Sequence, residues 1–116
     1  MIRGDVVIAD FPFQDVAGSK IRPALVVQND ADNKSLPNTS LAMITGNLAD
    51  AGRPTNVLID PAIPEGAGSG LHGPSLVKCG NLATLRQSRV KRIIGHLTDE
   101  LIQQVNAALK AALELP

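Results

Sequence analysis

Arg22 is the residue whose type and setting best suit chemistry on a phosphate group. It lies in the stretch Lys20–Asp30, which reads K-I-R-P-A-L-V-V-Q-N-D. The apolar run that follows has the length and β-branched content of a buried strand. Because proline cannot donate to a β-ladder, this strand is predicted to begin at Pro23, with Arg22 immediately before its first residue. A guanidinium there offers five donors in one rigid plane that suits phosphate, and an ion pair with a nearby carboxylate is the more ordinary alternative.

Other reactive side chains form no comparable pattern. His72, His96 and Cys79 are scattered without ligand spacing, so neither a metal site nor a cofactor is predicted. Two histidines could share acid and base roles, but His96 falls in an apolar strand pattern that favours a hydrogen-bonded core residue. The run Glu65–Gly70 is rich in glycine, yet no Gly-Lys-Ser/Thr follows it. We therefore expect a mobile loop over Ile63–Pro74 and no phosphate-binding loop.

Composition narrows the class of protein. A chain of 116 residues with 44% hydrophobic content is expected to form a single domain over residues 1–116. Eleven basic and eleven acidic residues cancel, so any nucleic-acid contact must be local. Phe11 and Phe13 are the only aromatic residues, which argues against stacking bases on an aromatic platform. The single cysteine and the lack of a leader or spanning run indicate a cytoplasmic protein with no membrane partner.

Hydrophobic patterns predict many short strands and one late helix. Asn29–Asp30 can cap a short helix or turn, and Thr98 is a good N-cap for a longer helix with an apolar face, packed on the domain or on a second subunit. Such a chain is predicted to be mainly β (α+β), with a small curved antiparallel sheet or barrel and a C-terminal α-helix. The expected strands cover residues 6–9, 23–27, 40–45, 56–59, 75–79, 81–85 and 93–97.

The chain resembles the MazF/PemK family of toxin endoribonucleases. The resemblance is carried by R-G-D-V at Arg3–Val6 and, most specifically, by the block R-P-A-L-V-V-Q-N-D at Arg22–Asp30. It continues through Ile44-Thr45, Pro54–Val57 and the segment from Ser75 to Leu85, and the terminal helix follows in its expected place. The similarity spans nearly the whole chain.

This resemblance implies a fold, an activity and partners. The fold would be an SH3-like barrel with accessory helices, assembled as a homodimer. The activity would be metal-independent cleavage of single-stranded RNA at short sequences, through attack of a 2′-OH that leaves a 2′,3′-cyclic phosphate and a 5′-OH. A cognate antitoxin protein would neutralise it, and no cofactor is implied.

The family's catalytic arginine and threonine fall on Arg22 and Thr45, both at predicted strand ends. Asn81 stands where family members carry a glutamine in the RNA groove. The basic run formed by Arg86, Arg89, Lys91 and Arg92 is a candidate outer contact for RNA or antitoxin, and a solvated surface is the alternative. The candidate RNA contacts are Ser19, Lys20, Asn47, Asn81, Thr84 and Arg86.

One segment departs from the family pattern. Many members carry an acidic residue, a glutamine, an apolar residue and an arginine before a threonine, where this chain has Gly80-Asn81-Leu82-Ala83. Altered base preference is the favoured interpretation, and reduced activity is the other. The rival function is a non-nuclease toxin of the same fold that binds a protein such as DNA gyrase. A non-toxic barrel whose groove serves only protein partners is a third possibility.

Overall fold

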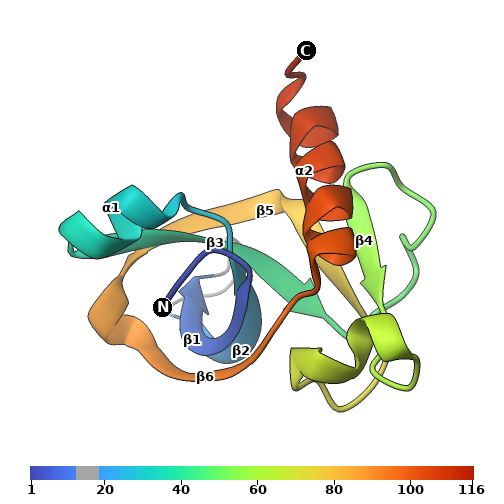
Figure 1. Cartoon of the computed structure of the whole chain (residues 1–116), viewed down its shortest axis with the longest axis horizontal. Coiled ribbons are helices and arrows are strands. Elements are labelled where there is room, and N and C mark those ends of the chain that lie inside the picture. The colour runs from blue at the N-terminus through green and yellow to red at the C-terminus, as the bar shows by residue number, and fades with distance from the viewer. Residues whose placement is uncertain (13–18) are drawn as a thin grey trace.

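The computed structural model describes residues 1–12 and 19–116, and the statements below concern those residues. The prediction of a mainly β fold with a C-terminal helix is confirmed (Figure 1). The strands are β1 (Asp5–Pro12), β2 (Ser19–Val26), β3 (Asn38–Thr45), β4 (Asn56–Ile59), β5 (Ser75–Arg86) and β6 (Val90–His96). The helices are α1 (Asp30–Ser35), α2 (Asp99–Leu113) and the short 3₁₀ helices η1 (Pro64–Ser69) and η2 (Gln87–Arg89).

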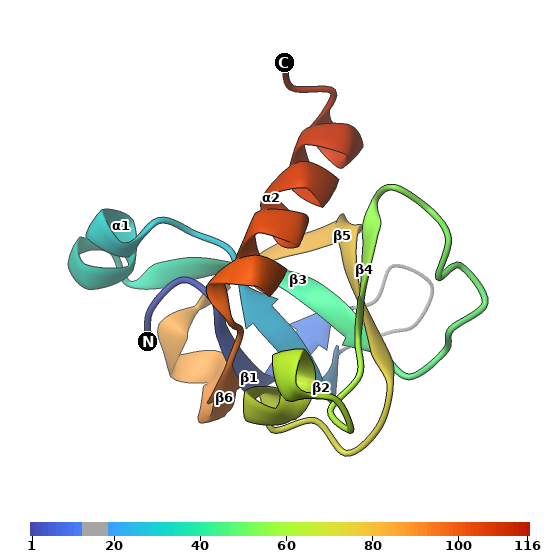
Figure 2. The ribbon, with the colours of Figure 1, turned by 45° about the vertical axis from the view of Figure 1, so that its right-hand side comes forward.

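The described strands form one antiparallel sheet in the order β4-β5-β3-β2-β1-β6. Figures 1 and 2 show that this sheet is strongly curved and that α2 rises from one side of it. Two neighbouring pairs join strands that are not consecutive in sequence, namely β3 with β5 and β1 with β6. The curvature therefore brings the two chain halves together around a small interior.

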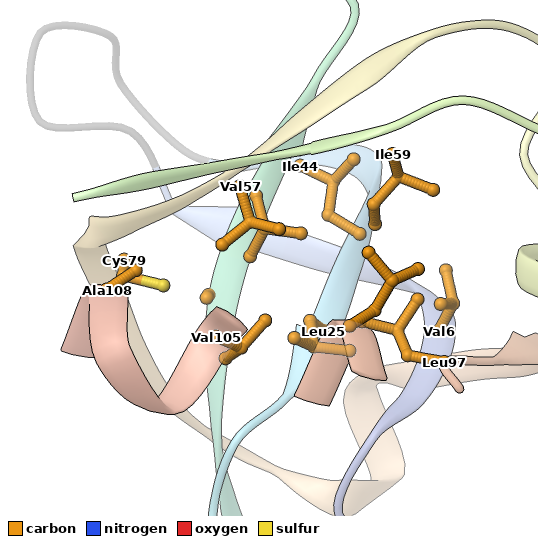
Figure 3. Packing of buried hydrophobic residues seen from close by; sticks show 12 residues of the cluster. Val6, Leu25, Ile44, Val57, Ile59, Cys79, Leu97, Val105 and Ala108 are labelled. Atoms are coloured by element: carbon orange, nitrogen blue, oxygen red, sulfur yellow. The ribbon is translucent and has the colours of Figure 1, made fainter. Parts of the chain in front are cut away.

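Both faces of the sheet bury apolar side chains, following the period-2 alternation of strands. One face packs against α2 and includes Val6, Leu25, Ile44, Ile59 and Cys79 (Figure 3). The buried members of the other cluster come only from strands: Val7, Ala9, Phe11, Ala24, Val26, Leu41 and Leu85. Among the described residues, therefore, the strands alone supply the buried side chains of this second cluster.

Helix α2 begins as the sequence predicts. The Thr98 hydroxyl accepts a hydrogen bond from the backbone N–H of Leu101, and two acidic residues occupy the first turn. Leu101, Val105 and Ala108 are buried against the sheet. The apolar face of α2 thus packs on its own domain, which decides between the two alternatives left open by the sequence. The expected cap of α1 is also present, as the Asn29 side chain accepts from Asp32 N.

Several strand boundaries differ from the predictions, and those of β2 and β5 differ most in meaning for the site. β2 starts at Ser19, not at Pro23, because β1 pairs with it as far as Pro12 opposite Ser19. Its ladder with β3, however, covers only Ala24 to Val26, which fits a proline nitrogen that cannot donate. The two strands expected around Gly80 are one strand, β5, with a register shift opposite Ala42 and Met43. A bulge absorbs the extra residues there without breaking the strand.

The glycine-rich segment is a packed element, so the expectation of a mobile loop there is wrong. It forms η1, in which Gly66 and Ser69 are buried, and it lies against β6. A Cβ at Gly95 of β6 would lie 2.3 Å from the carbonyl carbon and oxygen of Ser69. A Cβ at Gly70 would lie 2.1 Å from the Ile94 oxygen. Glycine is needed at these positions because two backbones approach closely.

Candidate functional site

Arg22 and Thr45 lie on adjacent strands at the point where β2 and β3 separate. The printed ladder pairs Ala24 with Met43 and Val26 with Leu41. The same register continued by two residues places Arg22 opposite Thr45. Alternation then puts both side chains on one face of the sheet, the face that carries Ala24, Val26, Leu41 and Met43 in the second cluster.

The two side chains offer different donors to that shared position. Both residues are half-buried. The Thr45 hydroxyl oxygen accepts a hydrogen bond from the backbone N–H of Asn47 at 3.1 Å. This contact holds the oxygen in place and leaves the hydroxyl hydrogen for a ligand. The backbone of Arg22 is held in place by its pairing with Ala9 of β1 and by the rigid Pro23 that follows it.

Lys78 is a third donor on this face, and the sequence analysis missed it. It lies on β5 directly opposite Met43, two pairs away from the Thr45–Leu76 pair and on the same face as Thr45. Its ammonium is 3.6 Å from a carboxylate oxygen of Asp50, and its side chain is 26% exposed. The signal in the sequence is a lone lysine inside the apolar strand Ser75–Cys79. A guanidinium, a hydroxyl and an ammonium around one position can together bind a phosphodiester and stabilise charge that develops on it.

The candidate RNA contacts divide into near and far positions. Asn47 is exposed in the turn just after Thr45, where its side-chain oxygen accepts from Ala49 N. Asn81 is exposed and lies in the extra segment of the β5 bulge, between the pairings of Lys78 and Leu82. Both therefore lie near the Thr45 end of β3. Ser19 and Lys20 belong to β2, opposite Pro12 and Phe11, and their side chains lie outside the described part of the structure.

Thr84 and Arg86 lie farther along β5. Thr84 is opposite Ser40, with the two hydroxyl oxygens 3.1 Å apart, and Arg86 is opposite Asn38. At about 3.4 Å per residue, these pairs are roughly 17 and 24 Å from Thr45 along β3. Alternation also puts Thr84 and Arg86 on the other face of the sheet from Thr45. The structure does not bring these two residues to the Arg22–Thr45 position.

The remaining reactive groups have structural surroundings. His96 Nδ1 is 2.8 Å from Asp5 Oδ1, which makes it a hydrogen-bonded partner of a buried carboxylate. Cys79 is fully buried in the cluster under α2, and burial raises the pKa of its thiol to about 11. Such a thiol is protonated at neutral pH and is no nucleophile. Among residues 1–12 and 19–116, no three His, Cys, Asp or Glu side chains gather as a possible metal site.

A cavity of about 360 Å³ adjoins the strand separation. Pro23 and Gly46, the residues that follow Arg22 and Thr45, are part of its wall. His72 and Arg92 also line the cavity, and most of the other lining residues are apolar or glycine. The candidate site thus has two parts. Arg22, Thr45 and Lys78 lie on one face of the sheet, and the cavity wall includes the residues that follow Arg22 and Thr45.

Comparison with known proteins identifies the family of this chain. Residues 2–113 match the family described as PemK-like, MazF-like toxin of type II toxin–antitoxin system. The chain belongs to this family. The match confirms the predicted family, and with it the predicted class of enzyme, endoribonuclease, since the curated MazF relatives carry that name. A search for a helix long and apolar enough to cross a membrane found none in the described residues.

Individual MazF-like proteins match over nearly their full length. Endoribonuclease MazF of Staphylococcus saprophyticus is 35% identical, over 99% of this chain and 92% of the relative. Endoribonuclease EndoA of Bacillus subtilis is also 35% identical, over 97% of this chain and 94% of that protein. A mycobacterial endoribonuclease, solved in complex with its cognate antitoxin, superposes with a TM-score of 0.77. It is 26% identical, and the match covers 100% of this chain and 97% of that structure's chain.

Proposed function

We propose that residues 1–116 form one toxin domain that cleaves single-stranded RNA at specific short sequences, without a metal ion. The observation that supports this proposal is the β2–β3 register, which, continued two residues past its last pair, would bring Arg22 and Thr45 opposite each other on one face. Family membership supports the RNA substrate. Arginine suits this position because its planar fork can hold two phosphoryl oxygens at once.

The reaction needs only orientation, proton transfer and charge stabilisation. The 2′-oxygen of the nucleotide 5′ to the cut bonds to phosphorus and loses its proton, and the bond from phosphorus to the 5′-oxygen breaks. The departing oxygen takes up a proton, so the products are a 2′,3′-cyclic phosphate and a 5′-OH. Arg22 and Lys78 would stabilise the negative charge on the phosphoryl oxygens, and the Thr45 hydroxyl would donate to one of them. Because the pKa of an arginine lies above about 12, an electrostatic role for Arg22 is favoured over that of general base.

The proposed activity can be tested with purified protein, a long single-stranded RNA and EDTA. Arg22→Ala and Thr45→Ala should each lower the cleavage rate by about 10²–10³, the usual loss of a donor directed at transition-state charge. Arg22→Lys should restore little, because an ammonium cannot reproduce the fork. Arg53→Ala is a matched control, since the Arg53 side chain is 73% exposed and pairs only with Asp50 among the described residues.

Thermal unfolding of each variant would show that the fold is intact. Full activity in Arg22→Ala, or cleavage by the parent that requires a divalent ion, would contradict the proposal. An absence of cleavage by the parent under all conditions would favour the rival, a toxin of the same fold that binds a protein target.

We further propose that the toxin is a homodimer that acts in the cytoplasm. The apolar face of α2 is occupied by its own sheet, so other surfaces must supply the interface. Large apolar side chains stand exposed on β2 and β6, where Ile21 is 62% exposed and Ile93 is 52% exposed. Light scattering at tens of micromolar should report twice the mass of the 12.1 kDa chain. A monomer at that concentration would contradict the dimer.

A cognate antitoxin is the remaining proposed partner. A groove that binds anionic RNA also suits an acidic, disordered segment that folds on binding. The basic run consists of Arg86, Arg89, Lys91 and Arg92, and Lys91 is partly neutralised by Asp10 at 3.3 Å. Replacing all four with glutamine should weaken antitoxin binding at low salt. Unchanged affinity for both antitoxin and RNA would show that the run has no such role.

A further inference from the structure

The cavity beside the Arg22–Thr45 site is built from five separate parts of the chain. One side of the cavity is a row of three residues on neighbouring strands. In this row Ile8 of β1 pairs with Pro23 of β2 on one side and with Arg92 of β6 on the other. Leu71 and His72, from the segment between η1 and β5, form another wall. At about 360 Å³ it is at the small end of ligand sites, which usually have about 300–1,000 Å³. Such a cavity suits a single planar ring.

The cavity borders the proposed phosphate position through Pro23 and Gly46, the residues that follow Arg22 and Thr45. Alternation places Arg22 and Pro23 on opposite faces of β2, but the β2–β3 ladder ends at Ala24 and Met43. Beyond that pair no ladder joins the two strands, and Pro23 and Gly46, on either side of this gap, both line the cavity. Consecutive Cα atoms are about 3.8 Å apart, so the cavity wall begins within one residue of both Arg22 and Thr45. A phosphate at those residues would have the base of an adjoining nucleotide within reach of the cavity.

Charge and hydrogen-bonding capacity indicate which ring fits. Among the described residues that line the cavity there is no carboxylate, and Arg92 is the one permanently charged side chain. Arg92 is exposed, and no ion pair joins it to another described residue. An unpaired guanidinium in a mainly apolar pocket suits a base that offers two acceptors on one edge. Guanine does so through O6 and N7, and its pairing with arginine is the commonest specific base contact.

We propose that this cavity holds a guanine base next to the scissile phosphate and that Arg92 selects it. The inference rests on the proposed ribonuclease function and adds a specificity-determining residue to it. Pro23, Ile8 and Leu71 would contact the faces of the ring, and Arg92 would donate two hydrogen bonds to its edge. Arg92 is then a binding residue, and its loss should change which sequences are cut more than whether the phosphodiester reacts.

The test is to map the cuts that each variant makes in an RNA library of random sequence. The parent should show about a 5- to 100-fold preference for guanine at one position within two nucleotides of the cut. Arg92→Gln should shift that position towards adenine, because glutamine pairs with adenine N6 and N7. Arg53→Gln, an arginine outside the cavity, should leave the preference unchanged.

A second variant blocks the cavity without changing a charge. A Cβ at Gly73, another residue of the lining, would meet no atom within 4 Å, and the same holds for Gly52 in the β3–β4 connection. Gly73→Leu should therefore fold, project into open space at the cavity and weaken the guanine preference at least fivefold. Gly52→Leu is the matched control and should cut like the parent. Thermal unfolding of both variants would verify the fold.

The outcomes separate this inference from the proposed function. Cleavage by the parent with the same sequence preference in Arg92→Gln and Gly73→Leu would overturn the cavity proposal and leave the ribonuclease in place. A uniform fall in rate with no change in preference would make Arg92 a phosphate contact and would also overturn base selection. No cleavage by the parent would refute both. A cavity that instead binds only the antitoxin would show unchanged cuts and weakened antitoxin binding in Gly73→Leu.

Discussion

Gly95→Ala should destabilise the protein strongly, because it separates two backbones that touch. The added Cβ would lie 2.3 Å from the Ser69 carbonyl carbon and oxygen and 2.4 Å from the Gly68 oxygen. Ordinary contacts of a Cβ are 3.4–4 Å, so η1 and β6 must move apart by about 1 Å. All three neighbours are backbone atoms, and no side-chain rotation can relieve the clash. The cost should therefore be at the upper end of the range for overpacking, about 3 kcal/mol.

The assay is thermal or urea unfolding of Gly95→Ala beside the parent. For a domain of this size, about 3 kcal/mol lowers Tm by roughly 10–15 °C. Gly52→Ala is the control, since a Cβ there meets nothing within 4 Å and its effect on the unfolded chain is similar. The control should change stability by less than about 1 kcal/mol. A Gly95→Ala variant as stable as Gly52→Ala would refute the close packing of η1 on β6.

Three further predictions concern parts of the fold away from the site. The buried Thr39 hydroxyl donates a hydrogen bond to Asn33 Oδ1 at 2.7 Å. Asn33→Ala removes this acceptor and should lower the unfolding free energy measured in urea by about 1–3 kcal/mol. A decrease of less than about 0.5 kcal/mol would contradict this. The backbone N–H of Arg3 donates to Asp30 and lowers the pKa of that carboxyl, so its stabilising contribution is present above about pH 4 and lost as pH falls through the lower folded value. Asp30→Asn should thus flatten the fall of Tm with acid, and an unchanged slope would exclude this contribution. Cys79 should react with a thiol reagent at pH 8 only as fast as the protein opens, since the Cys79 thiol is fully buried and its pKa is about 11. Rapid labelling of the native protein would instead place the thiol at the surface.

Local patterns were sufficient to predict most elements of the fold. Thr98 begins α2 because a hydroxyl cap and two acidic residues precede an apolar face, and these are interactions within one turn. The strand from Asn56 to Ile59 has the predicted bounds for a similar reason. Arg22 and Thr45 could be singled out from the motif, and the register of β2 and β3, which ends two residues short of them, is consistent with their proposed proximity.

Features that depend on distant contacts could not be predicted from the sequence. Gly80 suggested a break between two strands, but β4 and β3 hold both halves of β5 in one ladder with a bulge. The glycines from Gly66 to Gly70 suggested a mobile loop, although β6 and Asp60 lie against them. The relation of Lys78 to Thr45 is visible only once β3 and β5 are paired. In each case the deciding neighbour lies on another strand.

The most direct test of the proposed mechanism is the fate of an RNA that lacks one 2′-OH. The substrate is an oligonucleotide with a mapped cut, prepared with ribose throughout or with a single deoxyribose just 5′ of the scissile phosphate. Cleavage of the all-ribose strand should leave a 2′,3′-cyclic phosphate and a 5′-OH, and the single deoxyribose should slow cleavage at that bond by at least about 10³-fold, since it removes the nucleophile. Cutting the deoxy substrate at a comparable rate, or leaving a 3′-OH and a 5′-phosphate, would contradict the account.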